Sequence, residues 1–205
     1  MTSLRVDQPD LHVEDADLVG RRWRTGTLLL ILADAAFVAA LMFSYLYLRG
    51  LNTEHAWLAP KQDTAAIWLS WLIAGVLAVS AAVFYWGYRG ILAGGEARLV
   101  TASAFALLIV LIAGVLQFVQ LATFPFGVAD SAYSSCMYVI AGANLVHILI
   151  TMFLGLGMWN RSRRHMYSAD TNWQVHVVTL WWSWIALAAI AVSFVTSYIT
   201  SPNLH

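Results

Sequence analysis

"LLLILADAAFVAALMFSYLYLRG", residues Leu28–Gly50, is an almost unbroken apolar stretch. About 20 such residues are enough for a helix that crosses a bilayer. Asp34 interrupts the stretch roughly two helical turns from its start. A carboxyl group at that depth costs a few kcal/mol on insertion scales. The neighbouring helices must therefore supply a partner for this group, or the protein needs the carboxyl group for its function.

The composition of the whole chain also indicates a membrane protein. Of the 205 residues, 60% are hydrophobic and only 11% are charged, whereas soluble domains carry roughly 25% charged residues. The formal net charge is zero, so the charge balance does not indicate a nucleic-acid partner. The single cysteine, Cys136, excludes an intrachain disulfide and a thiolate cluster. We therefore expect an all-α, polytopic membrane protein with almost no soluble part.

Five apolar segments are long enough to span a bilayer, and short polar connections separate them. They cover Thr25–Leu48, Thr64–Tyr88, Leu99–Phe124, Ser131–Trp159 and Gln174–Ile199. The sequence thus predicts a bundle of five transmembrane helices. Residues 1–22 are polar and have no apolar signal-peptide core. They are expected to form a cytoplasmic tail, and residues 23–205 are expected to form the five-helix domain.

The basic residues predict how the chain is oriented. Nine arginines lie in the N-terminal segment or in the connections that would share its side of the membrane, whereas only Arg49 and Lys61 lie on the other side. An excess of positive charge favours the cytoplasmic side. The N-terminus is therefore expected in the cytoplasm, and an odd number of spans then places the C-terminus outside.

A small set of polar residues lies within the predicted spans. It comprises Asp34, Gln117, Gln120, Asn144, His147 and, near the cytoplasmic start of the last span, His176. Asn144 and His147 are three residues apart and so share a helix face. At about 1.5 Å per residue, Asp34 and His147 reach similar depths, which predicts a hydrogen bond between the first and fourth spans. The bond would fix helix packing or belong to a proton relay, and the isolated placement of the polar groups favours packing.

The sequence does not indicate a redox centre. Haem bound by two histidines needs them at matching depth on facing helices, and only His147 lies deep in a span. A copper site would need clustered Cys, Met or His residues, and the sequence contains no such cluster. We therefore expect no catalytic residue, metal or haem in this chain.

Several of these segments resemble the haem-copper oxidase subunit III family. The segment "LADAAFVAALMFSYLYLRG" is similar to the start of the conserved part of that family. The segment "AYSSCMYVIAGANLVHILITMFLGLGMW" resembles its Gly-aromatic-His-Gly-x-His helix, read here as Gly142 to His147. The end, "WQVHVVTLWWSWIALAAIAVSFVTSY", is similar to its last helix. The resemblance extends from Trp23 to Tyr198, and five spans match short bacterial members.

The chain departs from the family pattern at several polar positions. Asp34 stands where Glu is usual, and Asn144 replaces the first histidine of the motif. Further departures are Gln117 and Gln120 at positions that often carry carboxylates, His176 in place of Glu, and Ser183 and Ala186 in place of His and Asp. Asp34 and His147 are the main polar residues that remain.

The resemblance implies an accessory function in the respiratory chain. Subunit III of these oxidases carries no haem or copper, packs on the catalytic subunit I, binds lipid in a cleft between its helices and supports sustained turnover. The complex reduces O2 to water and pumps protons. Haem and copper are then expected in partner subunits, structural phospholipid on this chain, and the bacterial cell (inner) membrane as its location.

The resemblance also implies roles for two sets of residues. The six polar residues of the spans are expected to be structural or to line the lipid cleft. Three arginines before the first span, Arg21, Arg22 and Arg24, suit the anionic headgroups of phospholipids at the cytoplasmic face. Alternatively, they act only as a topology signal.

Other functions remain open at this point. An accessory membrane subunit of a nitric-oxide reductase system would share the fold, and the missing carboxylates fit it somewhat better. A small transporter is disfavoured because the sequence has no inverted repeat and no pair of Gly/Pro-interrupted spans. A purely structural membrane scaffold shares every feature except the family resemblance.

Overall fold

The computed structural model describes residues 16–52 and 57–198. These residues form five long helices and no strand. The helices are α1 (Ala16–Leu51), α2 (Ile67–Leu92), α3 (Glu96–Ala122), α4 (Ala132–Ser162) and α5 (Trp173–Tyr198). All five are long and apolar enough to cross a membrane. The predicted fold class, an all-α bundle of five membrane-spanning helices, is confirmed.

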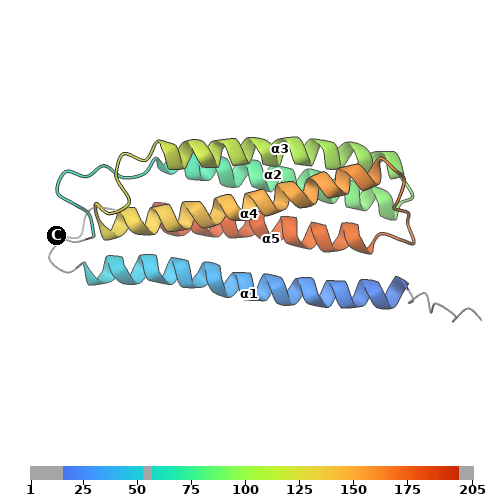
Figure 1. The fold of residues 1–205 in the computed structure, drawn as a ribbon, viewed down its shortest axis with the longest axis horizontal. Coiled ribbons are helices and arrows are strands. Elements are labelled where there is room, and N and C mark those ends of the chain that lie inside the picture. Colours follow the sequence, from blue (N-terminus) through green and yellow to red (C-terminus); the bar gives the residue numbers. More distant parts are fainter. Residues whose placement is uncertain (1–15, 53–56, 199–205) are drawn as a thin grey trace, which may run out of the picture.

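Four of the helices form a compact group, and α1 lies along one side of it (Figure 1). α2 packs on α3 and α5, and α3 also packs on α4. Within the described residues, α1 contacts α4 and α5 but neither α2 nor α3. Because α1 has neighbours on only one side, most of its apolar surface remains exposed, as suits a helix that faces lipid.

A fully buried tryptophan holds the centre of the four-helix group together. Trp182 of α5 stacks on Phe84 of α2 with 4.5 Å between the ring centroids. Its indole N–H donates to Ser80 Oγ over 3.0 Å. Ser80 Oγ donates in turn to the carbonyl oxygen of Ala106 on α3 over 2.8 Å. Three helices therefore meet at one side chain whose polar atom is satisfied.

α1 contacts the other helices through one narrow stripe. The stripe consists of Thr27, Ile31, Asp34, Val38, Leu41 and Tyr45, of which Thr27, Val38 and Tyr45 are buried. These positions follow one another at intervals of three and four residues, which is the spacing of helices that pack along a common seam. Asp34 lies in the middle of this stripe.

An aromatic cluster closes the end of the bundle where α1 ends. Tyr45, Trp57 and Tyr133 pack edge to face, with centroid distances of 5.0 to 6.3 Å. Tyr133 also fixes the α1–α2 connection, because its hydroxyl accepts the N–H of Ala65 over 2.9 Å and its own N–H donates to the carbonyl of Trp57 over 3.0 Å. The connection before α2 is therefore held against α4.

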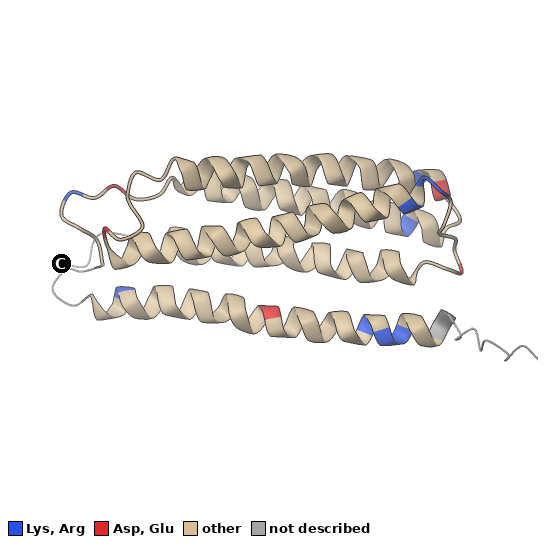
Figure 2. Ribbon diagram, viewed as in Figure 1, with Lys and Arg blue, Asp and Glu red and all other residues tan. Residues whose placement is uncertain are grey.

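The charged residues are distributed unevenly along the bundle (Figure 2). Most of the described basic residues lie at the end where α1 begins, hereafter the basic end. They are Arg21, Arg22, Arg24, Arg89, Arg98, Arg161, Arg163 and Arg164. Arg49 and Lys61 lie at the opposite end. The structure therefore brings the arginines together as expected, and their location in the cytoplasm stays a prediction.

The helices differ from the predicted spans chiefly at the first one. α1 begins at Ala16 rather than Thr25, so residues 16–22 of the predicted polar tail are helical. Apolar patterning marks only the part of a helix that lies in lipid, and the backbone hydrogen bonds continue beyond it. The rest of the predicted tail lies outside the described residues.

Candidate functional site

Asp34 has two hydrogen-bond partners, which come from two different helices. Its Oδ1 lies 2.8 Å from Nε2 of His147 on α4. Its Oδ2 accepts the Nε1–H of Trp184 on α5 over 2.7 Å. The predicted bond between Asp34 and His147 is confirmed. Trp184 was not predicted as a partner of Asp34, because nothing in the sequence of this tryptophan-rich helix distinguishes its indole N–H from those of the other tryptophans.

The geometry places one proton between Asp34 and His147. Trp184 can only donate, so Oδ2 of Asp34 is an acceptor. The remaining proton lies between Oδ1 and Nε2, either on the carboxyl group or on the ring. The side chains of Asp34 and His147 are 14% and 10% exposed, so the pair is largely buried between the helices.

The surroundings of His147 hold its ring in place. The ring of Trp181 meets it edge to face, at 6.2 Å between centroids. The indole N–H of Trp181 donates to Thr151 Oγ1 over 3.2 Å. Thr151 Oγ1 donates to the carbonyl oxygen of His147 over 2.8 Å. α5 thus supports the Asp34–His147 pair through two tryptophans.

The remaining polar side chains of α3 and α4 form a second network. Asn144 Nδ2 donates to Gln117 Oε1 over 2.5 Å, and Gln117 Nε2 donates to Gln120 Oε1 over 2.8 Å. Gln120 Nε2 then donates to Ser70 Oγ on α2 over 2.7 Å. The expectation that these polar groups are isolated is wrong, because the rotation of the helices, which the sequence does not show, turns them toward one another.

This amide network surrounds a small cavity of about 30 Å³ between α2, α3, α4 and α5. A cavity of that size has room for one or two water molecules. Among the described residues, no hydrogen bond joins the amide network to the Asp34–His147 pair. Amide side chains also do not titrate. The arrangement therefore favours the packing interpretation over a proton relay.

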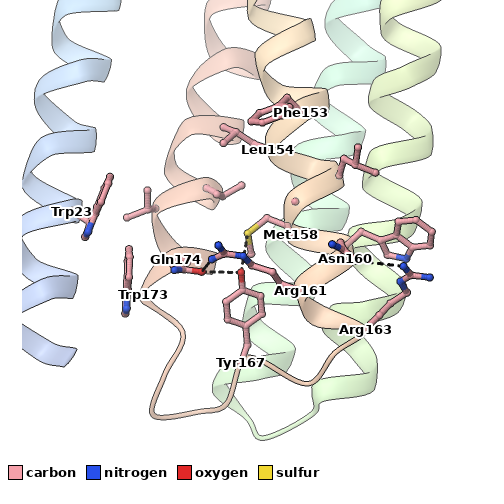
Figure 3. A pocket seen from close by; sticks show the side chains of 15 residues that line it. Trp23, Phe153, Leu154, Met158, Asn160, Arg161, Arg163, Tyr167, Trp173 and Gln174 are labelled. Atoms are coloured by element: carbon pink, nitrogen blue, oxygen red, sulfur yellow. Dashed lines mark hydrogen bonds between the residues drawn. The ribbon is translucent and has the colours of Figure 1, made fainter. Parts of the chain in front are cut away.

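A large groove opens between α1, α4 and α5 at the basic end (Figure 3). Its volume is about 780 Å³, and its walls are mostly apolar, with Phe153 and Leu154 on the α4 side. Trp23 of α1 and Trp173 of α5 lie parallel to each other at its edge, 5.8 Å apart between centroids. None of the six polar residues that were predicted to be structural or to line a lipid cleft belongs to the described walls of this groove.

Polar side chains gather at one end of the groove. Arg161 Nη1 and the Tyr167 hydroxyl both donate to Oε1 of Gln174, over 2.5 and 3.0 Å. Burial raises the pKa of Tyr167 while Arg161 opposes this shift, so the phenol remains a donor at neutral pH. Arg163 lies over the ring of Trp159 at 4.1 Å. The groove therefore combines an apolar interior with guanidinium groups at its end.

His176 belongs to neither polar network. Its ring stacks on Tyr88 of α2, with 5.4 Å between centroids and 11° between planes. It lines a small polar pocket together with Arg21 and Arg24. Arg22 does not line that pocket, so the three arginines that the sequence grouped together have different surroundings.

The described residues do not bring metal-binding side chains together. Within residues 16–52 and 57–198, no three His, Cys, Asp or Glu side chains form a group that could hold a metal ion. Cys136 is a half-buried free thiol. That the whole chain binds no haem or metal stays a prediction.

The fold and these contacts define a multi-pass helical membrane protein whose buried polar side chains bond to one another. The family "Cytochrome c oxidase subunit III" matches residues 8–200. The chain belongs to this family, and the resemblance drawn from the sequence is confirmed.

Individual relatives show how far the likeness extends. The chain is 22% identical to cytochrome c oxidase subunit 3 of Drosophila yakuba over 180 residues, which cover 82% of this chain and 64% of that protein. It is 21% identical to the Aedes aegypti subunit over 189 residues, 83% of this chain and 68% of that protein. It is 24% identical to the Thermostichus vulcanus subunit over 204 residues, 97% of this chain and 94% of that protein. The aligned part thus spans about two thirds of the insect relatives and nearly all of the Thermostichus one.

Proposed function

We propose that this chain is the accessory subunit III of a haem-copper terminal oxidase and packs against the catalytic subunit I. The observation that carries this proposal is the family match over residues 8–200. The five-helix bundle supports it, since α1, with neighbours on one side only, leaves apolar surface for other subunits and lipid. Electron transfer and O2 reduction then take place in partner subunits, and the complex lies in the bacterial cell membrane.

We also propose that the chain holds a membrane phospholipid in the groove between α1, α4 and α5. A volume of about 780 Å³ with mostly apolar walls suits acyl chains. Arg161 and Arg163 at one end suit a phosphate-bearing headgroup. Because the lipid would contact α1 on one side and α4 on the other, it would help hold α1 in place.

Copurification tests the subunit assignment. The tagged chain is solubilised in mild detergent, and the optical spectrum and the accompanying subunits are determined. We expect a haem spectrum together with a large subunit that contains copper. Haem without copper would instead assign the chain to a nitric-oxide reductase system. A colourless chain, alone or bound only to itself, would contradict both assignments.

Two glycine substitutions on α4 test the lipid groove. A Cβ atom added at Gly157 or at Gly142 meets no atom within 4 Å, but only Gly157 lines the groove. We expect Gly157→Leu to lower the amount of phospholipid that copurifies with the chain, and Gly142→Leu to leave it unchanged. Equal phospholipid content in the two variants and the wild type would contradict lipid binding in this groove.

A further inference from the structure

A second pocket lies between the start of α1 and the start of α5, and it is polar. Its volume is about 290 Å³, and it shares Trp173 with the large groove. The other residues that line it are Gly20, Arg21, Arg24, Asp170, Asn172 and His176. α1 and α5 approach closely here, since a Cβ atom on Gly20 would lie 3.0 Å from Cβ of Trp173. We propose that this pocket binds a phosphate group.

The charges that line the pocket favour an anion. Arg21 and Arg24 are three residues apart and therefore share a face of α1. Among the described residues that line the pocket, Asp170 is the only carboxylate. In the described part of the chain, neither guanidinium takes part in a hydrogen bond or an ion pair. Two unpaired guanidinium groups on one face repel each other, and an anion bound between them removes that repulsion.

Phosphate is the anion whose geometry these groups fit best. A guanidinium presents planar, paired N–H donors that match two phosphate oxygens at once. His176 supplies a ring nitrogen that can donate a further hydrogen bond, and its stacking on Tyr88 holds the ring at the pocket wall. α5 begins at Trp173 in the same wall, so the positive end of its helix dipole adds to the attraction.

A topology signal alone does not require this arrangement. Positive charge near the membrane is sufficient to orient a helix, wherever the side chains point. Arg164, in the α4–α5 connection at the basic end, serves that purpose equally well, and it lines neither pocket. A role in setting the membrane topology does not explain why two unpaired arginines and a histidine line the same pocket.

The phosphate group has two possible sources, a phospholipid headgroup or free inorganic phosphate. Binding of a phospholipid headgroup rests on the proposal that this chain holds a membrane phospholipid, whereas binding of inorganic phosphate does not depend on that proposal. Arg21→Gln, Arg24→Gln and the double variant remove charge from the pocket. Arg164→Gln is the matched control, because it removes one arginine charge at the same end from a side chain that lines neither pocket.

The experiment uses the full-length chain in neutral maltoside micelles at constant ionic strength. In one arm, inorganic phosphate is titrated against the thermal unfolding midpoint, with chloride as the reference salt. In the other arm, phosphatidylglycerol is added to the micelles and its binding is measured by native mass spectrometry, with diacylglycerol, which lacks phosphate, as the reference lipid. The pocket variants and Arg164→Gln are compared with wild type in both arms.

We expect each pocket variant to weaken binding by about tenfold or more, as the loss of a hydrogen bond to a charged group predicts. Arg164→Gln should leave the affinity within about twofold of wild type, because Arg164 lines neither pocket and its attraction for a bound anion is screened by salt. Binding in the lipid arm alone identifies a headgroup, and binding of inorganic phosphate identifies free phosphate; either supports the proposal.

Two results would overturn the proposal. One is an equal loss of affinity in Arg24→Gln and Arg164→Gln, which would show general attraction to the basic end. The other is a wild-type protein that binds neither probe more tightly than the double variant does. Copurification with a haem-copper oxidase would still support the proposed function in either case, so the two failures can be told apart.

Discussion

Asp34 fixes the position of α1 relative to the rest of the bundle. α1 contacts α4 and α5 only along a narrow stripe, and apolar contacts between helices gain little when lipid is as apolar as leucine. A carboxyl group whose two oxygens bind His147 and Trp184 therefore gives α1 a fixed register against both neighbours.

We predict that Asp34→Asn is tolerated and Asp34→Leu is not. In the asparagine variant, the side-chain oxygen can still accept from Trp184, and the nitrogen can donate to a neutral His147. Leucine leaves both partners unpaired, which costs about 1 to 3 kcal/mol for each buried group. Thermal unfolding in detergent, followed by tryptophan fluorescence, should show a clearly lower midpoint for Asp34→Leu only.

The control for this pair is Asp63→Asn, at an exposed carboxyl group in the α1–α2 connection. It should leave the midpoint unchanged. If Asp34→Leu unfolds at the same temperature as wild type, the Asp34 contacts do not stabilise the bundle. If Asp34→Asn and Asp34→Leu are equally destabilised, the charge of the carboxylate matters more than its hydrogen bonds.

Gln117 provides a second prediction at the scale of single residues. It is 1% exposed and links Asn144 on α4 to Gln120 in its own helix. We expect Gln117→Met to lower the stability by about 1 to 2 kcal/mol, because Asn144 and Gln120 each lose a partner. Adding Asn144→Leu should cost less than the sum of the two single changes, since it removes one of the orphaned groups. A double-mutant cycle measures this coupling, and strict additivity would contradict the network.

Single residues also show what the sequence can and cannot predict about the site. The Asp34–His147 bond was predictable, because depth in a membrane follows from counting residues along two helices. The link from Asn144 to Gln117 was not, because it depends on how each helix is rotated about its axis. Trp184 was missed for a related reason. Its neighbours Trp181 and Trp182 look the same in sequence, yet they bond to Thr151 and Ser80.

At the scale of elements, small residues allow the backbones of α2 and α3 to pack closely against each other. Gly87 on α2 faces Ala102 on α3, and a Cβ atom at Gly87 would lie 2.4 Å from that of Ala102. Small residues let helix backbones approach in lipid, where dispersion forces rather than the hydrophobic effect hold helices together. The two backbones here are at the limit of approach.

We predict different effects on stability for the same substitution at two glycines of α2. Gly87→Ala should destabilise the chain by about 1 to 3 kcal/mol, because the overlap with Ala102 forces the helices apart. Gly75→Ala meets no atom within 4 Å, so it should be neutral or stabilise by up to about 1 kcal/mol through helix propensity. Unfolding midpoints of the two variants in the same detergent make the comparison. A neutral Gly87→Ala would show that α2 and α3 separate without cost.

The lengths of the apolar segments were enough to predict that the chain forms five helices. They did not always predict the residues at which the helices begin and end. The α1 helix extends back to Ala16 through charged residues, where hydropathy gives no signal. The start of α4 is clearer, since Ser131 caps it by accepting the N–H of Ser134 over 3.1 Å. A capping serine next to an apolar run is a local signal, whereas α1 begins well before the apolar run that it contains.

At the scale of the whole molecule, both pockets lie at the basic end of the bundle, where Figure 2 shows most of the described arginines. The sequence predicted the gathering of charge, because every second connection returns to the same side. It did not predict the pockets, which arise where α1 approaches α5 closely at Gly20 and leaves α4 further away. A lipid or phosphate ligand would therefore bind from one side of the membrane only.

The orientation of the bundle decides which side that is, and the excess of arginine predicts the cytoplasm. Ala93 lies in the connection at the basic end, and Val128 in a connection at the opposite end. In a Cys136→Ser background, we expect a membrane-impermeant thiol reagent to label Val128→Cys in intact spheroplasts. It should label Ala93→Cys only after the membrane is opened. The opposite pattern would place the arginines and both pockets outside the cell. In that case the positive charge would serve ligand binding alone, because it could not have set the topology.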